Sequence, residues 1–353
     1  MISNLTYVKS PDETVRQSVT VVAEIGVNHN GNLTQAKRLV EAAINAGADV
    51  VKTQFFDART LVDSATPTAR YQRLSTVTET MRGLLNDLEL SLDDIFALAE
   101  LCKAGNVGFA ISVFSEKDIN RIAPLKPDFI KIASGEITNV PLLIEAGRSG
   151  LPLVLSTGMS YEYEVLSAVN HLIDVGASST GITLLHCTSA YPAPLDQLDL
   201  QVIGRWRTDY PYKVGYSDHS LFPEVAVAAV ALGATLIEKH LTLDRYQQGP
   251  DHASSLVPDQ FSDMIRMIRH IEQSLGSSSK VPHHSETENR MLARKSIFAK
   301  SRIVPGETFG PLNIMTRRPQ VGLGAEYWKE IMGLRAKRGY EVGQSIDRAE
   351  LDA

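Results

Sequence analysis

Short apolar runs recur along residues 21–242, and each of them ends in polar residues. Glycine-containing segments such as NAGAD, KAGN and DVGA precede several of these runs, as expected where a helix ends and a strand begins. Near-continuous apolar strands are typical of parallel sheets whose strands alternate with helices. The runs are VVAEIG (21–26), DVVKTQ (49–54), VGFAIS (107–112), FIKIASGE (129–136), LPLVLSTG (151–158), ITLLHCTS (182–189), YKVGYSDHS (212–220) and TLIEKHLT (235–242).

Amphipathic helical patterns fill the gaps between these runs. Eight strands, each followed by a helix, predict an α/β fold of the (β/α)8 TIM-barrel type. An open doubly wound sheet is the alternative, but NHNGN after the first strand does not match its glycine-rich GxGxxG fingerprint. The helical patterns cover residues 33–46, 92–104, 140–149, 161–175, 224–232 and 258–275.

Three further segments complete the predicted organisation. Residues 57–91 form a long connection that contains ARYQRLS (69–75), and it is equally consistent with a substrate lid and with a plain surface loop. A barrel domain over 1–275 is expected to end in a polar linker over 276–290. Short apolar pieces separated by Gly and Pro then predict a small, loop-rich C-terminal domain over 291–353.

Composition describes an ordinary globular protein, with 43% hydrophobic and 22% charged residues in 353. The two cysteines, Cys102 and Cys187, form no CxxC pair and fit a reducing compartment; we interpret the first as helix core and the second as packing. Residues 1–20 lack the apolar core of a signal peptide, and the apolar run 225–232 is too short to span a membrane. We therefore expect a cytoplasmic protein without membrane partners.

Net charge is −6, but residues 291–353 hold 11 Lys/Arg against 7 Asp/Glu and are net positive. The sequence has neither a clustered basic face nor a high pI, so it does not indicate a nucleic-acid partner. Four histidines outside the strands are interpreted as surface or linker residues, an interpretation that is weaker for His252 because it adjoins Asp251; they are His252, His270, His283 and His284.

Glu24 lies inside the first apolar run, where an unpaired carboxylate is unfavourable. Either a structural ion pair stabilises it or the carboxylate takes part in chemistry. In a barrel, the strand ends converge on one face, so the polar residues there predict the site. These residues are Glu24, Lys52, Gln54, Ser112, Lys131, Ser134, Ser156, His186, Ser189, Ser217, Asp218, His219, Glu238 and His240.

Two pairs of residues on this face suggest specific chemistry. His219 and His240 end neighbouring strands and can hold a divalent cation with positions left open. Lys52 and Lys131 are buried cations that require anions, and with nearby serines they resemble a phosphate and carboxylate cradle. Pairing with a barrel glutamate such as Glu136 or Glu238, or a Schiff-base role, is the alternative for each lysine.

Nearly the whole chain, from about residue 20 to about residue 348, resembles the sialic acid synthase (N-acetylneuraminate synthase) family. The C-terminal RKSIFAK, VPGE and RRP resemble the antifreeze-like (SAF) domain of that family. The resemblance rests on AEIGVNHNG, VVKTQ, FIKIASGE, STGM, LLHCTSAYPAP, GYSDHS, IEKHLTLD and QGPDHASSL.

This resemblance implies a transferase that condenses phosphoenolpyruvate with an N-acylated hexosamine such as N-acetylmannosamine, with C–O cleavage and release of phosphate. A legionaminate-type synthase acting on a 2,4-diacetamido-trideoxy hexose is the alternative. Mn²⁺ or Mg²⁺ would bind His219 and His240, Glu24 would be the catalytic acid/base, and the enzyme would be a domain-swapped homodimer. The resemblance implies phosphoenolpyruvate binding by Lys52, Ser112, Lys131, Ser134, Ser156, Ser189 and Ser217, and sugar binding by Gln54, Tyr191, Asp251 and Arg318.

Three positions depart from the family pattern. Ser189 stands where Asn is frequent, Val113-Phe114 replaces Thr-Pro, and RPQVG (318–322) replaces RPGNG beside Arg318. The GPDH segment (249–252) resembles neuraminate and legionaminate synthases more than pseudaminate synthases. A metal-dependent barrel hydrolase, a Schiff-base aldolase and an ice-binding module are the other functions to consider. The hydrolase is disfavoured because the first strand lacks an HxH pair, and the ice-binding module because the C-terminal domain is basic.

Overall fold

The computed structural model describes residues 18–68 and 80–352. The chain divides into two compact units, of which the first ends at Gly276 and the second begins at Ser277. Each unit is described by itself. The segment ARYQRLS (69–75), which is consistent with either a substrate lid or a surface loop, lies outside the described residues. Within the described ranges, no helix is both long and apolar enough to cross a membrane.

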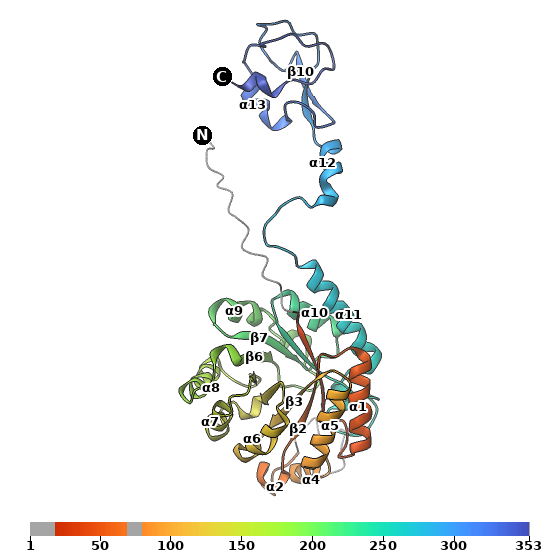
Figure 1. The fold of residues 1–353 in the computed structure, drawn as a ribbon, viewed down its shortest axis with the longest axis vertical. Coiled ribbons are helices and arrows are strands. Elements are labelled where there is room, and N and C mark those ends of the chain that lie inside the picture. Colours follow the sequence, from red (N-terminus) through yellow and green to blue (C-terminus); the bar gives the residue numbers. More distant parts are fainter. Residues whose placement is uncertain (1–17, 69–79, 353) are drawn as a thin grey trace. The chain divides into compact units, whose positions relative to one another are not determined.

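The first unit is a closed barrel of parallel strands that pair in chain order, with β1 also pairing with β8. The predicted (β/α)8 fold is therefore confirmed, and Figure 1 shows the helices arranged around the strands. The strands are β1 Thr20–Gly26, β2 Val50–Phe55, β3 Gly108–Val113, β4 Phe129–Ile132, β5 Leu153–Ser156, β6 Ile182–Cys187, β7 Lys213–Asp218 and β8 Leu236–His240.

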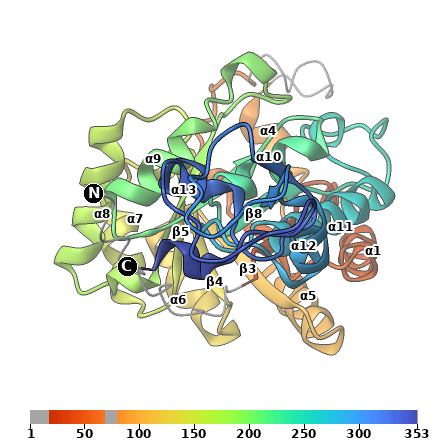
Figure 2. The same cartoon turned by 90° about the horizontal axis from the view of Figure 1, so that it is seen from above.

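Helices follow the strands on the outside of the barrel, where Figure 2 shows α7 and α8 on one side and α1 and α11 on the other. Ser91 and Asp94 form a capping box at the start of α5. The sequence patterns did not single out α6 and α9, because α6 is short and α9 buries few apolar side chains. The helices are α1 Leu33–Ala46, α5 Leu92–Ala104, α6 Glu116–Ile122, α7 Val140–Arg148, α8 Glu162–Asp174, α9 Gln201–Asp209, α10 Pro223–Ala231 and α11 Pro258–Ser274.

The barrel interior contains an apolar layer beneath a polar one. Successive side chains of a strand point to opposite faces, so residues two apart share the interior. On β1, Val22 belongs to the apolar layer and Glu24 lies one step closer to the carboxyl end; Val50 and Lys52 repeat this on β2. The apolar layer consists of Val22, Val50, Ala110, Phe129, Val154, Leu185 and Leu236. This layer closes the barrel below the polar side chains.

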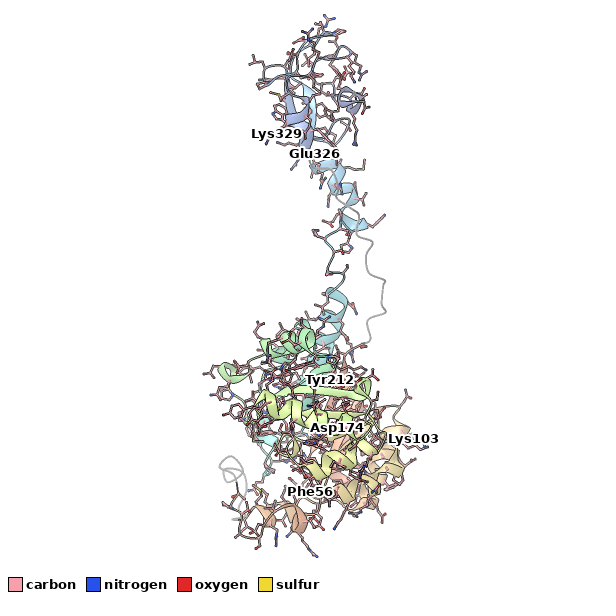
Figure 3. All side chains as sticks on the ribbon, turned by 90° about the vertical axis from the view of Figure 1, so that its left-hand side faces the viewer. Phe56, Lys103, Asp174, Tyr212, Glu326 and Lys329 are labelled. Atoms are coloured by element: carbon pink, nitrogen blue, oxygen red, sulfur yellow. The ribbon has the colours of Figure 1, made fainter. Side chains whose placement is uncertain are left out.

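The described parts of the connection after β2 include the short helices α2 (Ala58–Leu61) and α4 (Met81–Asn86), at the carboxyl end of the barrel. Figure 3 labels Phe56, which immediately follows β2 at this end. A small apolar cluster holds the connection in place, formed by Val27, Phe56, Leu84 and Leu88 with Leu61, Leu85 and Phe114 packed against it.

The second unit has little regular structure, as expected from its sequence. It contains α12 (Thr287–Ala293), the antiparallel strands β9 (Ser296–Ala299) and β10 (Ile314–Arg317), and α13 (Trp328–Ile331). Its own apolar core includes Ile297, Ile303, Phe309, Ile314, Leu323, Ile331, Tyr340 and Ile346. The assignment of this unit as an antifreeze-like domain stays a prediction.

Candidate active site

A cavity of about 310 Å³ lies at the carboxyl ends of the barrel strands. All the site residues predicted on the barrel except His186 and Asp218 line it, whereas Arg318 belongs to the second unit and is exposed. The predicted residues along its wall are Glu24, Lys52, Gln54, Ser112, Lys131, Ser134, Ser156, Ser189, Tyr191, Ser217, His219, Glu238, His240 and Asp251. The fold thus brings side chains from all eight strands and their following loops to one place.

Glu24 forms a buried ion pair with Lys52, one of the alternatives considered for it. Gln54 Nε2 donates a hydrogen bond to Glu24 Oε1 at 3.0 Å, and Lys52 Nζ donates to Ser112 Oγ at 2.9 Å. Burial raises the pKa of Glu24, and the attraction of Lys52 opposes this only in part. Glu24 therefore binds a proton at a higher pH than an exposed glutamate does.

Glu238 is the second buried carboxylate of the cavity, predicted both as a strand-end residue of the site and as a possible partner for a lysine. Lys131 Nζ lies 2.9 Å from Glu238 Oε1, and Lys52 Nζ lies 3.8 Å from Oε2. Burial opposes ionisation, but the two lysines outweigh it and lower the pKa of Glu238 to about 2. Glu136, the other proposed partner, accepts a hydrogen bond from Asn139 instead.

Serine hydroxyl groups lie around the two lysines. Ser156 is 2% exposed, and its Oγ has no hydrogen-bond partner within the described part of the chain. Ser134 Oγ accepts the Gly158 N–H at 3.0 Å. A Cβ at Gly158 would lie 2.2 Å from Ser189 Oγ, so glycine allows that hydroxyl to approach the wall. Buried cations with an unpaired hydroxyl are suited to an anionic ligand.

His219 and His240 lie side by side, with ring centroids 5.5 Å apart and the Tyr191 ring packed 4.2 Å from that of His219. His219 Nδ1 donates to the Thr188 carbonyl at 2.8 Å, which leaves Nε2 with its lone pair. Burial, reinforced by the charge of neighbouring His219, lowers the pKa of His240 and favours its neutral form. Asp251 Oδ2 lies 3.6 Å from His240 Nδ1.

These two imidazoles fit a divalent metal as donors. A histidine that binds a metal through one ring nitrogen usually donates a hydrogen bond from the other nitrogen to a carbonyl, as His219 Nδ1 does. Among residues 18–68 and 80–352, no group of three or more His, Cys, Asp or Glu side chains could hold a metal ion. The two histidines alone would leave other coordination positions of a bound ion to water or substrate.

Two residues predicted for this face point elsewhere. His186 Nε2 contacts the Leu198 carbonyl at 2.7 Å, and Asp218 pairs with Lys239 outside the cavity. The reason is the two-residue alternation of strands, since their neighbours Cys187 and Ser217 occupy the interior. Cys187, expected only to pack, lines the cavity with its Sγ 3.8 Å from His219 Nδ1.

The interpretation of His252 as a surface residue was wrong. Its side chain is 1% exposed, and its Nδ1 lies 2.7 Å from Thr242 Oγ1. Burial lowers the pKa of His252 to about 4. Its position after Asp251, in a loop that folds over the cavity wall, could not be distinguished from a surface loop by hydrophobic pattern. His270, His283 and His284 are exposed, as expected.

Comparison with known proteins shows the family to which the chain belongs. Residues 39–280 match the model of the NeuB family. The chain belongs to this family. The predicted resemblance to sialic acid synthases and the prediction of a synthase-type enzyme are both confirmed.

Relatives extend the match to most of the chain. It is 38% identical over 327 residues to the N,N'-diacetyllegionaminic acid synthase of Campylobacter jejuni, covering 92% of this chain and 98% of that protein. It is 31% identical to the N-acetylneuraminate-9-phosphate synthase of Homo sapiens, covering 81% and 79%. The crystal structure of an N-acetylneuraminic acid synthetase from Leptospira borgpetersenii, in complex with citrate, has a TM-score of 0.70 at 30% identity, covering 77% of this chain and 90% of that one.

Proposed function

We propose that this synthase condenses phosphoenolpyruvate with an N-acylated hexosamine to give a nonulosonic acid and phosphate. The observation that carries the proposal is the placement of two buried lysines and several serine hydroxyls beside two histidines in one barrel cavity. Family membership and the synthases among the relatives support the same reaction class.

Phosphoenolpyruvate would lie on the lysine side of the cavity. Its phosphate and carboxylate groups would bind Lys52 and Lys131, with Ser112, Ser134 and Ser156 donating hydrogen bonds. Ser189 and Ser217 extend the same wall. Because Glu24 and Glu238 occupy the lysines in the structure described here, binding of the anionic substrate would weaken these ion pairs.

His219 and His240 would hold the divalent metal, Mn²⁺ or Mg²⁺, through ring nitrogens: Nδ1 of His219 is bonded to the Thr188 carbonyl, which directs Nε2 to the ion, and burial favours the neutral form of His240. Such an ion, when bound, polarises a carbonyl oxygen such as that of the open-chain sugar aldehyde. Tyr191, Gln54 and Asp251 would orient the sugar beside the two histidines.

The reaction forms one C–C bond and breaks one C–O bond. C3 of phosphoenolpyruvate attacks the aldehyde carbon, and the resulting cation at C2 takes up a water molecule. The tetrahedral intermediate then loses phosphate with the C2–O bond electrons. Glu24, whose pKa burial raises, is suited to accept the proton of the attacking water and to stabilise the cation.

A 2,4-diacetamido-trideoxy hexose is the acceptor that we favour over N-acetylmannosamine. The legionaminic acid synthase relative is more similar to this chain than the human neuraminate-9-phosphate synthase. One side of the cavity is apolar and suits a deoxy methyl group better than a hydroxyl. This side consists of Val27, Leu85, Leu88 and Phe114.

We also propose that the active enzyme is a domain-swapped homodimer in which the second unit of one copy covers the cavity of the other and supplies Arg318. Large apolar side chains are exposed on the segments after β5, β6, β7 and β8, with Tyr246 as much as 96% exposed. They are Met159, Tyr161, Tyr163, Leu195, Phe222 and Tyr246. Sedimentation analysis that found only monomers under assay conditions would contradict this arrangement.

Phosphate release from phosphoenolpyruvate across a panel of N-acylated hexosamines tests the proposed reaction. Release is expected with at least one hexosamine, lost with EDTA and restored by Mn²⁺ or Mg²⁺. The 2,4-diacetamido-trideoxy hexose is expected to give the largest kcat/KM. No release with any hexosamine would refute the proposal, and borohydride trapping of substrate on Lys131 would favour a Schiff-base aldolase instead.

A further inference from the structure

The asparagine that follows β1 is fully buried and does not line the cavity. Asn28 Nδ2 donates one hydrogen bond to the Leu241 carbonyl at 2.9 Å and another to Ser255 Oγ at 2.8 Å. A carbonyl can only accept, so the orientation of the amide group is fixed. Both amide protons of Asn28 are thus directed at the loop between β8 and α11.

That loop carries Asp251, whose carboxylate reaches the cavity. Ser255 Oγ donates to the Asp251 carbonyl at 2.6 Å, so its own oxygen is free to accept from Asn28. Two consecutive hydrogen bonds therefore run from the Asn28 amide to the backbone of Asp251. This connection joins the first and last loops of the barrel, which are far apart in sequence.

Further contacts hold the same two loops together. Gln35 Nε2 donates to the Asn28 carbonyl at 2.6 Å and to Gln247 Oε1 at 2.9 Å. Gly249 has a φ of +145°, and a Cβ there would lie 2.7 Å from the His252 ring. Close packing at Gly249 leaves the loop little room to shift while Asn28 holds it.

We propose that Asn28 is a positioning residue for acceptor-sugar binding, acting through Ser255 on Asp251. This inference rests on the proposed function, in which Asp251 contacts the sugar. Loss of the Asn28 donors would free the backbone of Asp251 and let its carboxylate move away from His240, 3.6 Å away in the intact loop. The phosphoenolpyruvate side of the cavity, built on β2 to β7 and the loops that follow these strands, would be unaffected.

The test compares Asn28→Asp with Asn170→Asp in the full-length enzyme. Aspartate keeps the size of asparagine but removes both N–H donors of Asn28, whereas Asn170 is exposed on α8, on the side of the barrel opposite α1 and α11 (Figure 2). For Asn28→Asp, the KM of the hexosamine is expected to rise about 10-fold or more, because a buried acceptor loses its partner. The KM of phosphoenolpyruvate is expected to stay within about twofold, and Asn170→Asp to match the wild type on both.

Hydrogen–deuterium exchange gives a readout that does not depend on activity. Peptides covering 245–256 should exchange faster in Asn28→Asp than in the wild type and Asn170→Asp. Asn28→Ser, which retains a donor, is a second variant if the aspartate variant does not fold. Unchanged exchange, or an equal rise in both KM values, would overturn the inference. A wild-type enzyme inactive with every hexosamine would instead refute the proposed function and leave the exchange result to decide on the loop.

Discussion

The Lys239 ammonium group lies 2.6 Å from the Asp218 carboxylate, and neither side chain is exposed to solvent. The two residues are partners across β7 and β8, and each directly precedes one of the two cavity histidines. Lys239 Nζ also donates to the Ser220 carbonyl, and Asp218 Oδ1 accepts the Ser220 N–H at 2.8 Å. This cluster fixes the ends of both strands from the outside of the barrel.

Replacing Lys239 with Met should leave the buried Asp218 carboxylate without its cationic partner. The expected loss is about 3–5 kcal/mol in the free energy of unfolding, measured by urea denaturation. Arg266→Ala is the control, because the Arg266–Asp263 pair is 62% exposed on both sides and should contribute less than about 1 kcal/mol. Equal losses in the two variants would show that the buried pair has no special role in stability.

Glu24→Gln should keep the shape of the side chain while removing its ability to accept a proton. We expect kcat to fall by about 10²–10⁴-fold, the usual contribution of a general acid/base, with phosphoenolpyruvate and Mn²⁺ still bound in equilibrium titrations. Normal turnover in this variant would contradict the assigned role. Failure to bind phosphoenolpyruvate would show that Glu24 acts mainly by orienting Lys52.

Gly158→Ala should weaken phosphoenolpyruvate binding without unfolding the barrel. The added methyl would meet Ser189 Oγ at 2.2 Å, and that hydroxyl can rotate away at little energetic expense but then leaves the anion site. Loss of one hydrogen bond to a charged group predicts a rise of about 10-fold in the KM of phosphoenolpyruvate. At Gly181, the nearest atom to an added Cβ is 3.8 Å away, so Gly181→Ala should leave this KM unchanged.

Stability should depend on pH through His29. Burial lowers the pKa of His29 to about 4, below the value of about 6.5 in an unfolded chain. The unfolded state therefore binds a proton first as the pH falls. The stabilising effect is complete above pH 6.5 and is lost between pH 6.5 and 4, by roughly 3 kcal/mol in all.

Urea denaturation of His29→Gln at several pH values measures this effect. The variant should lose the part of the pH dependence that comes from His29, while His270→Gln, at an exposed position on α11, should follow the wild type. A wild-type unfolding free energy that is flat between pH 6.5 and 4 would contradict the prediction.

Much of the barrel could be predicted from sequence, because each strand is buried on both faces and reads as an apolar run. The side chains that line the cavity could be found for the same reason, as polar residues such as Lys52 and Lys131 interrupt these runs. What sequence did not reveal was the direction of neighbouring side chains near strand ends. His186 and Asp218 were assigned to the cavity and lie outside it, one position away from residues that do line it.

Other features depend on contacts between distant segments, which hydrophobic patterns do not encode. His252 lies in a polar loop that is bonded to Asn28 and Gln35, which are distant in sequence. Lys239, a charged residue within the last strand, has its partner on the strand before. The role of Arg318 stays a prediction, since it requires the placement of the second unit of another copy.

The apolar layer closes the base of the cavity, so that the cavity opens at the carboxyl end of the barrel. In the proposed reaction, phosphoenolpyruvate occupies the deep lysines, and the sugar occupies the rim near Asp251 and Tyr191. A molecule at the rim then blocks the passage of one below it. If the substrates occupy these positions, phosphoenolpyruvate would have to enter before the sugar, and phosphate left beneath the acid product would leave after it.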